Sequence, residues 1–321
     1  MLQVVKEQCL DYDTFISTTL HKMKEIMGEE YSIQIHKVIK NNSLELDSLI
    51  VLKEGKNFTP NIYLLPYYES YSQGTSMQEI ISRLCSIYQN YEVPVVSENF
   101  AYSFDEMKDC IIYRVVNYEK NKKLLSDIPH RKYLDLAITY HCLIRNDENG
   151  IGTIRITTEH MKQWKTEQRE IELLAIKNTP KLFPLSIRSM EEVIKAMLKD
   201  EFMTDREDDI PEEFLEQILN QNNSSQLHHK MYILSNKKGI NGATCMLYEN
   251  AIRDFAFQNN SDLFILPSSI HEIILIPKEE NMNRETLVEM VKDVNCTQVA
   301  PDEVLSDQVY IFSRKNNCIL L

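Results

Sequence analysis

The sequence predicts an α+β protein with mixed, largely antiparallel sheets, covered by helices and divided between two subdomains. Three observations predict this class: apolar runs of strand length, capping residues ahead of amphipathic helices, and short polar links between neighbouring strand candidates. We place an N-terminal α-β-β-β-α unit at residues 1–125. A larger C-terminal α+β domain, which contains the central sheet, follows at residues 126–321.

The C-terminal domain is organised around residues 231–277. Residues 262–266 and 272–276 are continuous apolar runs of strand length, and a proline follows each. Continuous runs are typical of strands buried on both faces, and the link from Ser268 to Glu272 is short enough to join them as an antiparallel hairpin. We expect three further strands to share sheet structure with this pair, at residues 133–144, 231–235 and 308–312. Residues 243–248 fit either a strand or a helix.

The N-terminal unit is predicted from its alternation and its capping residues. A helix is expected at residues 13–27, where Ile16, Leu20 and Met23 recur on one face. Ser76 and Glu79 have the spacing of a capping box ahead of a second helix. Between the two helices, strands are expected at residues 31–38, 44–52 and 61–66.

The middle of the chain is less regular. Residues 110–116 are apolar but have no clear period, so they receive no element. The predicted strand at 133–144 turns at Asn146–Gly150 and returns. Ser189 and Glu192 form another capping-box pattern, which predicts the start of a helix.

Composition excludes several classes of protein. Only 7 glycines argue against a glycine-rich nucleotide loop, and a net charge of −13 disfavours binding to nucleic acid. The 7 cysteines are scattered and never spaced C-x-x-C, which argues against a disulfide framework and a zinc ribbon. The sequence contains neither a signal-peptide pattern nor an apolar run of membrane-spanning length. We therefore expect an acidic cytoplasmic protein without a cofactor, a metal or a membrane contact.

The strongest catalytic candidates are Ser268, Ser269, His271 and Glu272 on the hairpin link. A hydroxyl, an imidazole and a carboxylate are the groups that nucleophilic and acid–base catalysis use. Neighbouring side chains on a hairpin point to opposite faces, however, and serines also bond to the backbone of their own turn. The structural interpretation is therefore favoured over the catalytic one.

Other clusters have structural explanations that we favour. His228 and His229 follow a polar loop and have no third ligand at metal-binding spacing. His160 and Trp164 share a helical face, as packed aromatic residues do. The acidic window at 201–213 lacks the order of oxygen donors found in calcium loops. Nucleic-acid binding would need one further set of residues to gather on one surface: Lys120, Lys122, Lys123, Arg131 and Lys132.

Several strings in the C-terminal part carry a resemblance: residues 170–184, the organising stretch 231–277, and LVEMVKDVNCTQVAPDEVLSDQVYIFSR at 287–314. With these strings the chain resembles an uncharacterised domain-of-unknown-function family of anaerobic Gram-positive bacteria. The resemblance covers most of the chain and is strongest after Tyr133. It implies a bacterial cytoplasmic protein and brings no activity, cofactor or site residue.

The sequence favours an interaction or regulatory protein without catalytic activity, because its surface is acidic and no strong catalytic motif is present. A protein partner is compatible with this expectation, whereas the oligomeric state does not follow from the sequence. The alternative is a hydrolase or small-ligand-binding enzyme centred on Ser268 to Glu272. That alternative requires His271 and Glu272 to line a pocket together with polar residues from elsewhere, such as Asn178, Asn236 or Asn295.

Overall fold

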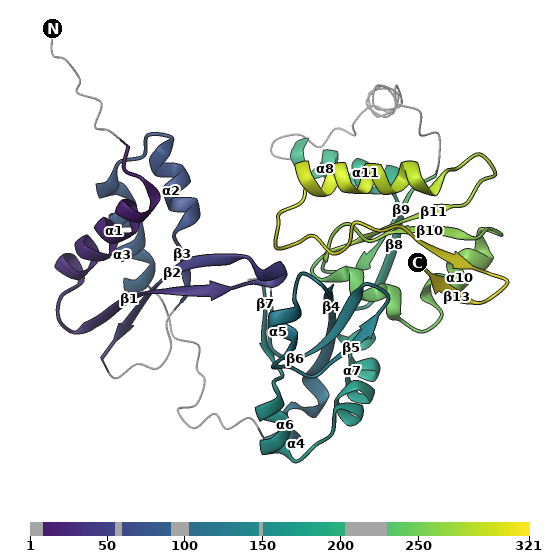
Figure 1. The fold of residues 1–321 in the computed structure, drawn as a ribbon, viewed down its shortest axis with the longest axis horizontal. Coiled ribbons are helices and arrows are strands. Elements are labelled where there is room, and N and C mark those ends of the chain that lie inside the picture. The colour runs from purple at the N-terminus through teal and green to yellow at the C-terminus, as the bar shows by residue number, and fades with distance from the viewer. Residues whose placement is uncertain (1–8, 55–59, 91–102, 148–149, 203–229) are drawn as a thin grey trace, which may run out of the picture. The chain divides into compact units, whose positions relative to one another are not determined.

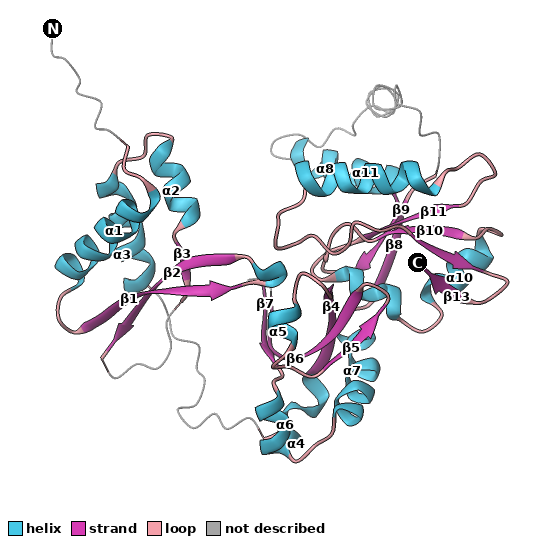
Figure 2. Cartoon of the chain, viewed as in Figure 1, coloured by secondary structure: helices cyan, strands magenta, loops and turns pink. Residues whose placement is uncertain are grey.

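The computed structural model describes residues 9–54, 60–90, 103–147, 150–202 and 230–321. The chain divides into two compact units, Met1–Ala101 and Tyr102–Leu321. This division lies upstream of the predicted boundary at 125. The reason is that the aperiodic residues 110–116 supply a strand that pairs with residues of the C-terminal unit. Figures 1 and 2 show the elements of each unit.

The first unit packs helices against one antiparallel sheet of order β1-β2-β3. Phe15, Met23, Leu49 and Leu84 form the centre of its core. The predicted α-β-β-β-α order is present, and Ser76 caps the helix by accepting a hydrogen bond from the Glu79 amide at 3.2 Å. The elements are α1 (Tyr12–Met27), β1 (Tyr31–Ile39), η1 (Asn41–Ser43), β2 (Glu45–Lys53), β3 (Ile62–Tyr63), α2 (Leu65–Ser72) and α3 (Met77–Gln89).

One predicted strand of this unit is corrected by the structure. The strand expected at 61–66 ends at Tyr63, and Leu65 begins the short helix α2. Pro66 lies in the first turn of α2, where its missing amide and fixed φ are compatible with a helix. The proline that was taken as the end of a strand is therefore part of a helix start.

The second unit contains two sheets, of which the first has four strands in the order β4-β6-β5, with β7 paired to β6. Helix α7 contacts β4 and β6, and its residues Ile171 and Ala175 belong to the main core. The elements of this part are α4 (Phe104–Met107), η2 (Lys108–Cys110), β4 (Ile111–Asn117), α5 (Lys122–Leu125), β5 (His130–Tyr133), β6 (Leu136–Asp147), β7 (Gly150–Arg155), α6 (Thr158–Trp164) and α7 (Gln168–Leu182).

The second sheet has six strands in the order β13-β12-β10-β11-β9-β8. Helices α8 and α11 lie on one side of it and α10 on the other (Figure 1). Residues of η3 pack in the same core cluster as those of α10. Its elements are β8 (Leu185–Ser189), α8 (Met190–Phe202), β9 (Tyr232–Asn236), η3 (Gly242–Leu247), α10 (Ala251–Gln258), β10 (Leu263–Leu266), β11 (Ile273–Pro277), α11 (Arg284–Thr297), β12 (Tyr310–Ser313) and β13 (Cys318–Leu320).

The predicted hairpin at 262–276 is confirmed. Strands β10 and β11 pair antiparallel with Ile265 opposite Leu275. Leu263 and Ile265 face the main core, whereas Phe264 and Leu266 pack in the cluster that includes residues of α11. Because both faces are covered, the apolar run is continuous.

Three other expectations for the C-terminal part are corrected or resolved. The strand at 133–144 corresponds to β5 and β6 in the four-stranded sheet and shares no sheet with 262–276, because β4, β5 and β7 are the partners of β6. Residues 243–248, left open between strand and helix, fall largely in the 3-10 helix η3. Strand β8 was not predicted, whereas the capping box of Ser189 and Glu192 at the start of α8 is confirmed.

The two sheets of the second unit are joined by a carboxylate. Asp135, between β5 and β6, accepts hydrogen bonds from the Tyr310 hydroxyl at 2.5 Å and from the Ser306 hydroxyl at 2.6 Å. Asn117 adds a bond from its side-chain amide to the carbonyl of Leu305. Burial raises the pKa of the Tyr310 hydroxyl, and the nearby Asp135 carboxylate raises it further, so this hydroxyl stays a donor.

Candidate functional site

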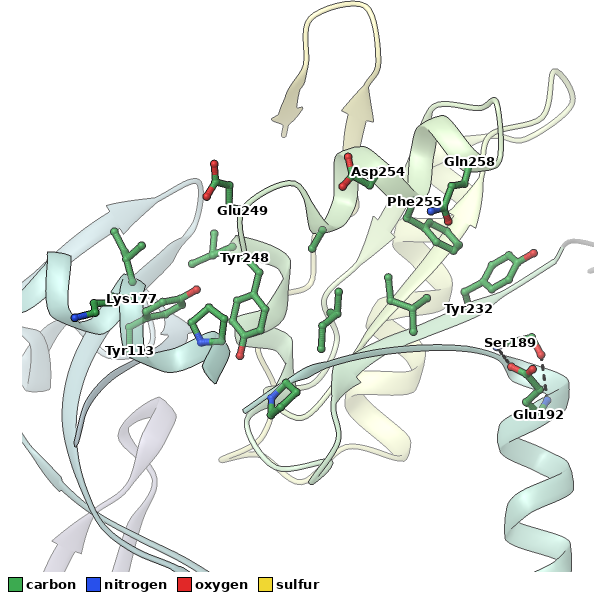
Figure 3. Close-up of a pocket in the computed structure, with 17 residues that line it drawn as sticks. Tyr113, Lys177, Ser189, Glu192, Tyr232, Tyr248, Glu249, Asp254, Phe255 and Gln258 are labelled. Atoms are coloured by element: carbon green, nitrogen blue, oxygen red, sulfur yellow. Dashed lines mark hydrogen bonds between the residues drawn. The ribbon is translucent and has the colours of Figure 1, made fainter. Parts of the chain in front are cut away.

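The second unit contains a groove of about 920 Å³ between three segments of the chain. The C-terminal half of α7 forms one wall, strand β8 forms the floor beside it, and the end of η3 with α10 forms the opposite wall. Figure 3 shows the labelled side chains around this groove, with Tyr113 and Tyr248 near one end and Tyr232 and Phe255 near the other.

Two prolines shape the wall and the floor. Pro180 lies inside α7 near its end, and Pro184 follows Phe183, the C-cap of this helix. Proline has no amide hydrogen, and it disfavours a helical conformation in the residue before it, so the helix stops and the chain continues as β8. The Tyr248 hydroxyl fixes this corner from the opposite wall by donating to the carbonyl of Phe183 at 2.7 Å.

The lining of the groove is apolar at its centre and acidic at its rim. Leu185, Ile187, Leu247 and Phe255 contribute apolar side chains. The charged lining residues are three carboxylates and one ammonium group: Glu192, Glu249, Asp254 and Lys177. A bound segment would therefore be attracted if it carried apolar side chains flanked by positive charge.

The aromatic residues of the groove are suited to packing and to donating hydrogen bonds. Tyr232 and Phe255 meet edge to face at 4.9 Å, and Tyr113 and Tyr248 at 6.4 Å. Burial raises the pKa of both Tyr113 and Tyr248, so their hydroxyls remain protonated at neutral pH. The lining residues include neither histidine nor cysteine, which leaves this groove without the usual nucleophile–base pair.

Strand β8 lies at the edge of the six-stranded sheet. The Lys237 amide donates to the Pro184 carbonyl, and the Met190 amide donates to the Met231 carbonyl. Backbone hydrogen bonds alternate along an antiparallel pair of strands. Between these two positions, the amide and carbonyl groups of successive β8 residues therefore point alternately toward β9 and away from it. The backbone groups of Leu185, Ile187 and Ser189 therefore point away from β9, and the same residues line the groove.

The outward edge of β8 is partly open. The Ser189 amide donates to the Glu192 carboxylate at 2.8 Å and is thus satisfied. Leu185 and Ile187 have no strand on their outer side in the described part of the second unit. An edge strand with free amide and carbonyl groups is a template for an added strand.

The structure places the link Ser268–Glu272 elsewhere, between β10 and β11 and away from the groove lining. Ser269 is buried and bridges to Val304, and its hydroxyl accepts from the backbone amide of His271 at 3.0 Å. Ser268 contributes its carbonyl, which accepts from the amide of Leu305. These bonds hold the link against the segment that precedes β12.

The imidazole of His271 has a partner on each ring nitrogen. The Asn241 amide donates to Nδ1 at 3.3 Å, and Nε2 lies 3.3 Å from a carboxylate oxygen of Glu303. Burial raises the pKa of Glu272, while His271 and the hydroxyl of Ser269 lower it. Within the described contacts, no hydrogen bond joins a serine hydroxyl of the link to this imidazole.

The polar residues named as possible companions of this link serve the backbone. The Asn178 side chain donates to the carbonyls of Lys108 and Ile111, and the Asn236 side chain donates to that of Ile240. Asn295 donates to the carbonyl of Ser306 and to Asp307. None of the three lies in the lining of the 920 Å³ groove.

Only some of the other clusters considered in the sequence analysis lie within the described residues. His160 stacks on Trp164 at 5.6 Å, so the packed interpretation is confirmed. His228, His229 and most of the acidic window 201–213 lie outside the described residues. Across the described residues, no group of three histidine, cysteine or acidic side chains could hold a metal ion. A search of the same residues found no helix with the length and apolarity needed to cross a bilayer.

The basic residues near 120–132 are largely engaged. Lys120 lies 3.6 Å from Asp307, Lys122 lies 2.5 Å from Glu119, and Arg131 lies 2.6 Å from Glu172. The Lys132 ammonium group lies over the ring of Tyr118 at 4.5 Å. Carboxylates therefore neutralise part of the positive charge that phosphate binding would need.

Sequence reasoning missed the groove residues. The alternation of Leu185, Ser186, Ile187 and Arg188 is a strand signal, but it is short and lies between two helices. Nothing local in the sequence indicates that Leu247 and Phe255 lie opposite it, because that approach depends on the pairing of β9 with β8.

Comparison with known proteins gives one match. A family model described as a family of unknown function, DUF5688, matches residues 12–314. No curated protein matches the chain, and no solved structure matches it.

Proposed function

The chain belongs to DUF5688, a family of unknown function, and on that premise we propose that it is a non-enzymatic interaction protein that binds an extended segment of a partner protein. The groove beside β8 is the proposed site. One observation carries the proposal: the open backbone edge of β8 adjoins an apolar groove with an acidic rim.

The proposed mode is addition of a strand to the sheet. The outward amides and carbonyls of Leu185 and Ile187 would supply backbone hydrogen bonds to the partner segment. Alternate side chains of that segment would enter the groove, where Leu247 and Phe255 provide apolar contact. Backbone bonding gives affinity to any extended chain, and the groove selects which side chains it carries.

The charge of the site defines the partner further. Glu249 and Asp254 lie on the wall opposite β8, and Glu192 lies where β8 ends (Figure 3). The chain as a whole has a net charge of −13, so a positively charged segment is attracted at long range as well as in contact. We therefore expect apolar residues alternating with lysine or arginine.

A fluorescent peptide of alternating valine and lysine tests the proposal by its anisotropy. We expect saturable binding to the wild-type chain and loss of binding when the peptide amides that face β8 are N-methylated. A valine–glutamate peptide should not bind, because Glu192, Glu249 and Asp254 would repel it.

A matched pair of variants tests whether the peptide binds along β8. Ile187→Pro removes the outward amide and leaves the bonds to β9 in place, whereas Ile187→Val keeps the amide. We expect Ile187→Pro to weaken binding on the order of tenfold and Ile187→Val to bind like the wild type. Equal binding by both variants, at unchanged circular dichroism, would remove β8 as the site.

The alternative function is a hydrolase or small-ligand-binding enzyme centred on Ser268–Glu272, and it stays a prediction. Its supporting observations are the pair of His271 with Glu303 and the raised pKa of Glu272, which burial causes. The proposal of binding is preferred because the Ser269 hydroxyl bonds to backbone. Ester hydrolysis that disappears in Ser269→Ala would favour the alternative.

We also place the protein in the cytoplasm. All 7 cysteines are free thiols in the structure, and three of them are buried: Cys85, Cys142 and Cys245. Free thiols persist in a reducing compartment. Alkylation of unfolded protein from native cells should label every cysteine without prior reduction, and a disulfide found there would contradict this location.

A further inference from the structure

The four-stranded sheet has a polar group in the middle of the face turned away from α7. Arg114 of β4 is paired with Thr139 of β6, and Arg155 of β7 is paired with His141 of β6. Residues directly opposite one another share a face, and so do residues two apart on one strand. These four side chains therefore lie on one face of the sheet.

The same face is apolar on both sides of this group. Ile112 and Leu143 pack with Phe183 at one end. Ala137 packs with Leu125 and Ile128 at the other end. The polar group thus interrupts an otherwise apolar surface: Thr139 and His141 are buried, Arg114 is half-buried, and Arg155 is exposed.

The two guanidinium groups have no counter-charge among the described contacts. Burial lowers the pKa of Arg114 to about 10, and the positive charge of Arg155 contributes to this shift. Burial also lowers the pKa of His141, and both arginines lower it further. His141 is 6% exposed, and its Nε2 is bonded to the Thr139 hydroxyl at 3.0 Å. The charged groups that act on this histidine, Arg114 and Arg155, are both positive.

Arg131 of β5 shows the usual arrangement on the opposite face. It pairs with Ile138, whose side chain belongs to the main core, and its guanidinium lies 2.6 Å from the Glu172 carboxylate. The Arg131 side chain is 48% exposed, and the protein itself supplies the carboxylate that neutralises it. Arg114 is half-buried and Arg155 is exposed, and neither is paired with a carboxylate among the described contacts, so both charges are available to an anion from solution.

We propose that Arg114, Arg155, Thr139 and His141 form a binding site for a phosphate group. Two guanidinium groups offer several donors in fixed forks, and the buried pair of Thr139 and His141 lies between them on β6. These donors exceed what the two oxygens of a carboxylate accept well. The charge of a phosphate dianion also matches the two arginines.

This site is independent of the peptide groove. Tyr113 lines that groove, and the next residue, Arg114, points to the other face of the same strand. Loss of one activity therefore leaves the other testable, and variants at Arg114 or Arg155 can be assayed with both ligands.

Isothermal titration calorimetry with inorganic phosphate at fixed ionic strength tests the site. We expect saturable binding to the wild-type chain and weakening by about tenfold in Arg114→Gln and in Arg155→Gln. Arg131→Gln is the matched control and should bind like the wild type. The absence of saturable heat would overturn the proposal, as would equal weakening in the control. Acetate that binds as tightly as phosphate would overturn the assignment to phosphate.

Thermal unfolding separates a ligand role from a structural role. Without phosphate, Arg114→Gln should melt at or above the wild-type temperature, because it removes a half-buried charge that has no ion-pair partner among the described residues. Phosphate should raise the melting temperature of the wild type and leave that of Arg114→Gln unchanged. An Arg114→Gln chain that melts lower without phosphate would make Arg114 a structural residue and contradict the site. Phenyl phosphate tested beside inorganic phosphate distinguishes an ester ligand from the free ion, and binding of either supports the site.

Discussion

The two sheets of the second unit differ in how polar residues are distributed over their faces. In the six-stranded sheet, β10 is buried on both faces, and Leu263 to Leu266 are all apolar. In the four-stranded sheet, β6 has an apolar face toward α7 and a face that contains Thr139 and His141. Both sheets are antiparallel and both are largely buried, so topology alone does not explain the difference.

The difference separates a strand that contributes burial alone from one that borders the proposed phosphate site. A strand that is apolar on both faces contributes burial and can be read from the sequence as a run. A strand that keeps a buried histidine between a half-buried and an exposed arginine places polar groups where burial alone would favour apolar ones. This arrangement directs functional experiments to the four-stranded sheet and to the open edge of β8.

The largest expected effect is the loss of stability caused by truncating a core side chain of the six-stranded sheet. Ile265→Ala removes a side chain that is 0% exposed between two layers, and we expect the free energy of unfolding to fall by about 2–5 kcal/mol. Leu173→Ala on α7, where the side chain is 59% exposed, is the control and should change it by less than about 0.5 kcal/mol. Urea denaturation followed by circular dichroism measures both values. Similar losses in the two variants would mean that β10 is not the centre of the core.

A smaller effect is expected where the two sheets are joined. Asp135→Asn replaces a carboxylate that accepts from both Tyr310 and Ser306 with an amide that has one acceptor oxygen. We expect a loss of about 1–3 kcal/mol in the free energy of unfolding. The exposed Asp293→Asn on α11 is the control, measured in the same urea series. An unchanged midpoint for Asp135→Asn would show that the sheets are held together by apolar contact alone.

The smallest effect is a pH dependence that sharpens the comparison. Burial, with Arg114 on β4 and Arg155 on β7, holds the pKa of His141 well below its usual 6.5. Below pH 6.5, the folded chain therefore binds fewer protons at His141 than the unfolded chain does. The His141 contribution is complete above pH 6.5 and is lost as the pH falls. The slope is at most about 1.4 kcal/mol per pH unit.

Comparison of the wild type with His141→Gln isolates this contribution. Glu272 acts in the opposite direction, because its pKa is raised by burial and its contribution is lost as the pH rises. Both chains contain Glu272 and every other titrating group except His141. Their contributions therefore cancel when the free energy of unfolding of one chain is subtracted from that of the other. Urea midpoints between pH 5 and 7, about the range in which histidine titrates, should converge at the acid end. Parallel curves would contradict a lowered pKa at His141.

Local signals in the sequence predicted much of the fold. The runs at 262–266 and 272–276 and the capping residues Ser76 and Ser189 act over a few positions, and each gave the correct element. No element was predicted at residues 110–116. Strand β4 combines an apolar face with Arg114 at the edge of its sheet, so its hydrophobic residues follow no single period. Pro66 was assigned to a strand end although it starts α2, since proline is compatible with both positions.

The sites depend on long-range pairing, which the sequence does not display. Arg114 and Arg155 are far apart in the chain and come together only through β6. The groove likewise needs β8 beside β9 and α10 opposite both. The link Ser268–Glu272 was noticed because its polar residues are adjacent, and adjacency favours turn chemistry over convergence on a ligand.

The short open edge of β8 has a consequence for the behaviour of the protein in solution. If β8 of one copy paired with β8 of another, two molecules of charge −13 would come into contact, with Glu192 just after the end of each strand. Electrostatic repulsion opposes such self-pairing, and salt screens it over about 10 Å at 0.1 M. We therefore expect light scattering to show larger species as ionic strength rises, so that dilute buffers keep the edge available to foreign chains.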